Sequence, residues 1–191
     1  MQASENRATT SAGTPPELVR AAFRELHGTR LHGFALLLTL GDRARAARLA
    51  GEALAAGMSR TAELRHPERA AAWLRRRVTR NAGRAGRHTQ GRSAGDGRPA
   101  LEELGAGAAA FAGLSALTTR ERAALVADSI ERLERGDVAT IVGIGGARLD
   151  RLIRRVRVRY TTTVAAALDE ASAADGPTVE RIQAIAARAL T

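Results

Sequence analysis

Residues 137–160 read DVATIVGIGGARLDRLIRRVRVRY, and this stretch decides the fold of the C-terminal half of the chain. A short apolar segment over 137–142 precedes a glycine-rich turn, which in turn precedes a helical pattern rich in arginine. The apolar segment uses small side chains, which allow close packing between helices. Gly143, Gly145 and Gly146 tolerate the backbone angles of a tight turn. This order predicts a helix-turn-helix.

The helix predicted over 147–171 has two chemically different faces. Its apolar residues recur at the spacing of a buried stripe: Leu149, Leu152, Ile153 and Val156. Its basic residues lie on the other side: Arg148, Arg151, Arg154, Arg155 and Arg159. A helix placed this way fits the major groove of DNA, where arginine bonds phosphates or guanine edges. A merely solvated basic face is the alternative interpretation, and the preceding short helix and turn weigh against it.

Other helical patterns surround this motif. Thr118 and Glu121 have the spacing of a capping box, in which each residue satisfies a free backbone N–H of the other. A helix is therefore predicted over 118–133, whereas the Ala/Gly-rich residues before it, 106–113, are ambiguous. The sequence Asp-Gly-Pro at 175–177 predicts a break before a last amphipathic helix.

The N-terminal half predicts three helices, because apolar residues recur there every three or four positions. The predicted helices cover 17–38, 43–56 and 67–85. Gly41 separates the first from the second, and Gly57 ends the second. Prolines at the start of the first and third helices favour helix initiation.

These patterns predict an all-α protein of two small helical domains joined by a flexible linker. Residues 1–16 are polar and rich in Ser, Thr, Gly and Pro, which is typical of a flexible arm. The first domain is assigned to 17–88 and the linker, which contains three glycines and a proline, to 89–100. The helix-turn-helix domain is assigned to 101–173, and a helical extension to 174–191.

Composition narrows both the fold and the partner. Of the 191 residues, 45% are hydrophobic but only 3% are aromatic, so the core must consist of Ala, Leu, Val and Ile, as helical proteins allow. The net charge is +10, and every basic residue is arginine. A GC-rich genome would also favour arginine codons. The charge predicts an anionic partner: nucleic acid first, an acidic protein or a membrane surface second.

Several function classes are disfavoured by what the sequence lacks. It has no cysteine, its four histidines show no metal-ligand spacing, and no serine–histidine–aspartate pattern or lysine-containing phosphate loop is present. We therefore expect a protein that is not an enzyme and that has no cofactor, metal or small-molecule substrate. The N-terminus lacks the pattern of a secretory signal, and the longest apolar run, 33–40, is too short to span a membrane. We expect a cytoplasmic protein without membrane contact.

A second basic segment lies over 65–92, where nine arginines accompany one acid. Four of these arginines recur every three or four residues and so line one side of the third helix: Arg76, Arg80, Arg84 and Arg87. This row, together with the neighbouring Asn81, predicts contact with DNA. Trp73 could stack on a base, but a single tryptophan at helical spacing is more typical of a core.

Taken together, the two halves of the sequence resemble a known family, the extracytoplasmic-function sigma factors. These are small two-domain proteins that direct bacterial RNA polymerase to promoters. Residues 23–54 and 67–87 are similar to the N-terminal domain of the family, and residues 114–160 to its C-terminal domain. The matching residues are Trp73, Leu74, Arg80, Asn81, Leu114, Leu117, Arg120, Glu121, Arg122, Arg155 and Arg157. Together the matching stretches span roughly residues 17–168.

The resemblance implies roles for both domains. The N-terminal domain would bind the polymerase core and help to open the promoter at the minus-ten element, and the C-terminal helix-turn-helix would read the minus-thirty-five element of duplex promoter DNA. Polymerase binding would involve Leu49, Glu52 and Leu54. An anti-sigma protein would be a further partner.

The sequence departs from the family pattern in two places. Family members usually have an acidic pair and a glutamine where this chain has Ala47, Arg48 and Gly51. This departure leaves open an alternative function, a sigma-like DNA-binding regulator that no longer binds core polymerase. Asp150 replaces a residue that is often basic. A protein-interaction module whose arginines meet an acidic protein is a further alternative.

Overall fold

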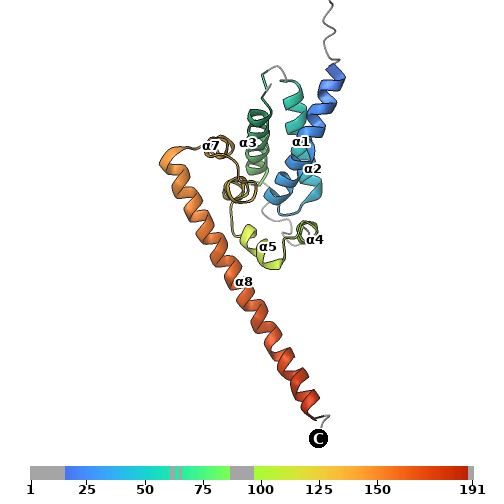
Figure 1. Cartoon of the computed structure of the whole chain (residues 1–191), viewed down its shortest axis with the longest axis vertical. Coiled ribbons are helices and arrows are strands. Elements are labelled where there is room, and N and C mark those ends of the chain that lie inside the picture. Colours follow the sequence, from blue (N-terminus) through green and yellow to red (C-terminus); the bar gives the residue numbers. More distant parts are fainter. Residues whose placement is uncertain (1–15, 61–62, 65, 87–96, 189–191) are drawn as a thin grey trace, which may run out of the picture.

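The computed structural model describes residues 16–60, 63–64, 66–86 and 97–188 (Figure 1). In these residues all regular secondary structure is helical, and no strand occurs. The all-α prediction is therefore confirmed. Within the same ranges, no helix combines the length and the apolar composition that crossing a membrane requires.

The N-terminal half contains α1 (Pro16–Leu38), α2 (Arg43–Met58) and α3 (Pro67–Gly86). All three agree with the predicted ranges to within two residues. Local signals explain their starts: Pro16 and Pro67 occupy first helical positions, and the Asp42 side chain caps α2 by accepting a hydrogen bond from the Arg45 N–H at 2.9 Å.

The C-terminal half contains shorter helices and one very long one. Its elements are α4 (Arg98–Glu102), α5 (Ala108–Ser115), α6 (Thr119–Leu125), the π-helical turn η1 (Val126–Ile130), α7 (Arg135–Val142) and α8 (Gly146–Arg188). The capping box at the start of α6 is confirmed. The Thr118 N–H donates to Glu121 Oε2 at 2.9 Å, and the Glu121 N–H donates to Thr118 Oγ1 at 3.3 Å.

Three expectations about this half are wrong in detail. The helix predicted over 118–133 changes to the π-helical turn η1 and ends at Ile130, because Arg132 takes a left-handed conformation with φ of 53°. Residues 98–100 of the predicted linker belong to α4, where Pro99 suits the first turn and Ala100 is buried. Helix α8 continues through the break predicted at 175–177, so the last helix predicted after it is part of α8 as far as Arg188.

Part of the predicted domain organisation falls on residues that the structure does not describe. The predicted arm (except its last residue, Pro16) and residues 89–96 of the predicted linker lie outside them. The helices of the two halves nevertheless pack together, with α3 against α6 and α7. One continuous buried cluster includes Phe34 and Leu74 from the N-terminal half, and Ile141 and Leu149 from the C-terminal half. The division into two domains stays a prediction.

His27 is a buried titratable residue on α1. Its side chain is only 8% exposed, and its ring meets the Phe23 ring edge-to-face, with 4.7 Å between centroids. Burial, and then the nearby Arg75 guanidinium, lower the pKa of His27 below its ordinary value of 6.5. The fold therefore holds this imidazole neutral.

Stability should fall in mild acid because of His27. The unfolded chain takes up a proton near pH 6.5, but the folded chain resists it. The contribution of His27 is therefore constant above that pH and is lost as the pH falls below it. We expect the melting temperature to drop more between about pH 7 and about pH 5 in the natural chain than in a His27→Gln variant. If the melting temperatures of the two proteins drop equally over this pH range, His27 has no such role.

Candidate nucleic-acid interface

The first turns of α8 present an exposed basic surface, which we call the α8 arginine face: Arg148, Arg151, Arg154 and Arg155. Within the described ranges, none of these four side chains has an ion-pair partner. The opposite side of the helix is fixed in the core by Leu149, Ile153 and Val156, which are at most 4% exposed. Leu152 is partly buried. The burial of these residues therefore turns the arginines outward, as the sequence pattern predicted.

The glycine turn sets the direction of α8 relative to α7. Gly143 ends α7 in the left-handed conformation, with φ of 69°, and its N–H donates to the Ala139 carbonyl oxygen at 2.8 Å. The Ile144 N–H donates to the same oxygen at 3.2 Å. Gly146, with φ of 57°, then begins α8. Two of the three predicted turn glycines therefore have positive φ, which other residues adopt only at a cost.

Acidic residues beside the α8 arginine face are neutralised by ion pairs. Asp150 accepts from Arg135, which also donates to Asp128 at 3.3 Å. Asp128 accepts in addition from Arg157 at 2.7 Å. The acid at position 150 is therefore paired with a cation that it shares with Asp128. Its pairing reduces the repulsion that a free carboxylate would exert on an approaching phosphate.

Arg159 differs from the other predicted arginines of α8. Its Nη1 donates to both carboxylate oxygens of Glu121, each at 3.2 Å. Glu121 is itself the partner of the N-cap residue Thr118 in the capping box of α6, and it is buried. Arg159 therefore joins α8 to α6, and we do not include it in the α8 arginine face.

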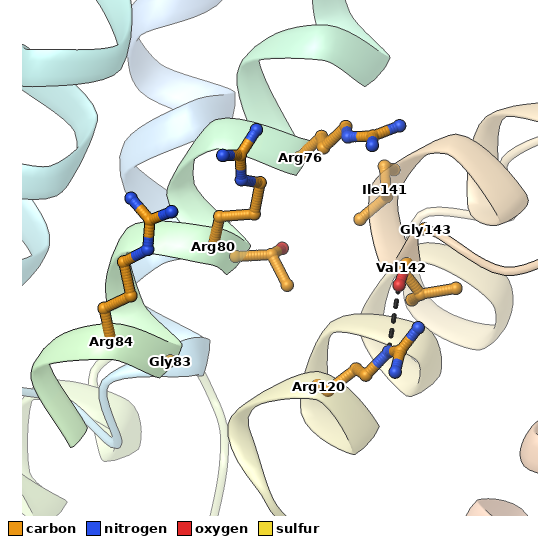
Figure 2. Close-up of a pocket in the computed structure, with 9 residues that line it drawn as sticks. Arg76, Arg80, Gly83, Arg84, Arg120, Ile141, Val142 and Gly143 are labelled. Carbon is orange, nitrogen blue, oxygen red and sulfur yellow. Dashed lines mark hydrogen bonds between the residues drawn. The ribbon is translucent and has the colours of Figure 1, made fainter. Parts of the chain in front are cut away.

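The predicted basic row on α3 lines a cavity between helices of both halves (Figure 2). The cavity has a volume of about 350 Å³, and we call it the arginine pocket. Its lining consists of Arg76, Thr79, Arg80, Gly83 and Arg84 from α3, Arg120 from α6, and Ile141, Val142 and Gly143 at the end of α7. The row is exposed, but the structure places it beside α6 and α7 and not on an isolated domain.

Asn81 and Trp73 lie on other sides of α3. The Asn81 side-chain amide donates to Glu52 Oε2 on α2 at 3.4 Å. Trp73 is partly buried against the core, which agrees with the core interpretation, and the guanidinium carbons of Arg60 and Arg77 lie 5.9 and 5.8 Å from its ring centroid. Arg87, the last residue of the predicted row, lies outside the described residues.

The residues predicted to bind polymerase are mostly inaccessible. Leu49 is 3% exposed and Leu54 is 9% exposed, because both pack into the core beneath α2. Only Glu52 reaches the surface, where its carboxylate also lies 4.0 Å from Arg48 Nε. The outer surface of α2 includes Ala47, Arg48, Gly51 and Glu52, which are all exposed.

The sequence pattern did not reveal the positions of two arginines of α6, one in the arginine pocket and one in the core. Arg120 belongs to the arginine pocket, where its Nε donates to the Val142 carbonyl oxygen at 2.9 Å. Arg122 is buried, and its Nη1 donates to the Leu114 and Leu117 carbonyl oxygens at 3.2 and 3.0 Å. Burial, and then Arg45, lower the pKa of Arg122 to about 10, so it stays charged at neutral pH. Arg122 thus has a structural role.

No protein-family model matches the chain, and no curated protein matches it either. The α8 arginine face and the arginine pocket are therefore the features that point to a function.

Proposed function

We propose that this protein binds duplex DNA and acts as a divergent sigma factor of the extracytoplasmic-function type. The observation that supports the proposal best is the α8 arginine face. Its four arginines are exposed and form no ion pair with any residue that the structure describes. They lie on the first turns of a helix that follows a short helix and a glycine turn. In this proposal, α7, the turn and α8 form a helix-turn-helix, and α6 supports it from behind.

The dimensions of α8 suit the proposed role. An α-helix with its side chains is about 10–12 Å across, and the major groove of DNA is about 12 Å wide. In known helix-turn-helix proteins, the N-terminal residues of the second helix contact the bases. Here those residues include Arg148 and Arg151, which would reach bases or phosphates, while Arg154 and Arg155 would contact the backbone farther along.

The arrangement of the elements supports a larger basic surface. Helix α7 lies between α3 and the beginning of α8 (Figure 1). The arginine row of α3 and the α8 arginine face therefore flank α7 on its two sides. A polyanion that follows the surface over α7 would meet both.

A second candidate function is a sigma-like DNA-binding regulator that does not bind core polymerase. The outer surface of α2 favours it, because Leu49 and Leu54 are buried there and Glu52 already accepts from Asn81. Retention of the full chain on bacterial core polymerase at low salt, with transcription from the DNA upstream of its own coding sequence, would support the sigma factor. DNA binding without retention would support the regulator.

Removal of three of the four arginines of the α8 arginine face should weaken DNA binding strongly. We expect the triple variant Arg148→Gln, Arg151→Gln, Arg155→Gln to lose at least about tenfold in affinity for duplex DNA, measured by fluorescence anisotropy. The dependence of log affinity on log salt should become shallower by about 0.9 for each phosphate contact removed.

A matched control distinguishes a specific face from net charge. Arg20, Arg24 and Arg30 are exposed on α1, and none has an ion-pair partner in the described part of the chain. Their triple replacement by glutamine removes the same charge and should change the affinity much less. Equal losses in the two triple variants would mean that α8 has no special role.

A further inference from the structure

We propose that the arginine pocket binds a linear polyphosphate group, either free or at the end of a nucleotide. This inference goes beyond DNA binding, because it concerns a small ligand at a cavity between the two halves of the chain. It is based on the charge, size and preorganisation of the pocket.

The charge of the pocket is entirely positive. Its lining includes four arginines, Arg76, Arg80, Arg84 and Arg120, and no carboxylate. None of the four forms an ion pair with any acid in the ranges that the structure describes. Several other arginines are paired with acids, among them Arg75 with Glu131, Arg135 with Asp128 and Asp150, and Arg157 with Asp128. Guanidinium groups bond phosphate oxygens in pairs, so this set matches a ligand with several phosphates.

The size of the pocket suits a small molecule. Its volume of about 350 Å³ lies at the lower end of the range for small-molecule sites, about 300–1,000 Å³. One phosphate would meet only some of the arginines, since they come from three successive turns of α3 and from α6. A chain of phosphates can meet guanidinium groups on both walls.

One wall of the pocket is preorganised. The bond from Arg120 Nε to the Val142 carbonyl oxygen fixes the guanidinium beside the end of α7 (Figure 2). It also neutralises part of the negative end of that helix, which would otherwise repel an anion. The terminal nitrogens of Arg120 form no hydrogen bond with another described residue. They remain available to a ligand.

The opposite wall leaves room for the phosphates. At Gly83, an added Cβ would meet no heavy atom within 4 Å, so the α3 surface is open there. The Thr79 hydroxyl, by contrast, donates to the Arg75 carbonyl oxygen at 2.9 Å, and so it contributes lone pairs but no free proton. The arginines are therefore the donors that would hold the ligand.

The test uses the full chain and two probes, inorganic tripolyphosphate and ATP, with affinity measured by titration calorimetry at low salt. We expect binding of both probes, and an increase in the melting temperature because each ligand joins the two halves. Equal affinities would show that the phosphates alone are recognised, whereas tighter binding of ATP would show an added contact with the nucleoside. Either result supports the site. Absence of binding by both probes would overturn it.

Single variants locate the site. Arg76→Gln and Arg80→Gln remove exposed side chains without a partner among described residues, so both proteins should fold, as circular dichroism would verify. Each should bind tripolyphosphate about tenfold more weakly, the loss of one charge-assisted bond. Arg69→Gln, on the exposed first turn of α3 and outside the pocket, is the matched control and should change binding less than twofold. Equal weakening in all three variants would indicate diffuse charge and overturn the proposal.

Discussion

Replacement of Arg75 by alanine should destabilise the fold by about 3–5 kcal/mol, a large fraction of the stability of a domain of this size. Arg75 Nε and Nη2 donate to the two carboxylate oxygens of Glu131 at 2.7 and 2.9 Å, and Nη1 donates to the Ala71 carbonyl oxygen at 3.2 Å. The Arg75 side chain is 7% exposed and that of Glu131 is 19% exposed. The variant would leave the carboxylate without its cation in a poorly solvated place.

The same replacement also affects how the two halves meet. Arg75 is on α3, Glu131 directly follows η1, and the Arg75 guanidinium lies 5.7 Å from the centroid of the Phe34 ring on α1. One side chain therefore contacts α1, α3 and the C-terminal half. Its loss should lower the urea midpoint and loosen α6 and α7 relative to α3.

A second ion pair between the halves is the control. Arg43 on α2 pairs with Glu103, but the two side chains are 60% and 67% exposed. Water screens such a pair, so Arg43→Ala should cost less than about 1 kcal/mol. The double variant Arg75→Met, Glu131→Leu should recover much of the loss, because no unpaired charge remains. A cost for Arg75→Ala no larger than that for Arg43→Ala would contradict the assigned role.

The helices could be predicted because their signals are local. Pro16, Gly41, Pro67 and the Thr118–Glu121 capping box act within one turn of chain, and apolar spacing marks the buried faces. The outward direction of the α8 arginine face was predictable for the same reason. Once Leu149, Ile153 and Val156 are buried, the geometry of the helix fixes the rest.

Interactions between distant parts of the chain could not be predicted. Arg75 follows the apolar spacing of Ala71, Leu74 and Val78, so the helical period places it on the buried side of α3, but no local signal marks its partner Glu131, 56 residues further along the chain. Arg120 joins the arginine pocket only because α3 packs against α6 and α7. Arg159 continues the α8 pattern, but Glu121 on another helix holds it. In each case the partner lies on an element that the pattern does not connect.

Gly41→Ala is the second substitution with a large expected effect. Gly41 follows α1 with φ of 85°, a conformation that costs a non-glycine residue about 1–2 kcal/mol. A Cβ at this position would also overlap the backbone carbonyl oxygen of Gly97, just before α4, and a Cβ on Gly97 would overlap the carbonyl oxygen of Leu40. The two backbone segments are therefore in direct contact, and only glycine fits on either side.

Gly41→Ala should accordingly lower the free energy of unfolding, measured by urea denaturation, by at least about 3 kcal/mol, because the backbone strain and the separation of the two segments add. Gly105→Ala distinguishes the two causes. Gly105 has a similar φ of 81°, but an added Cβ would meet no heavy atom within 4 Å. It should therefore cost only the strain, about 1–2 kcal/mol. The difference between the variants measures the close approach of the α1–α2 connection to the start of α4. If the two variants lose the same free energy of unfolding, the two segments can separate without loss, and their contact does not hold the N-terminal and C-terminal halves together.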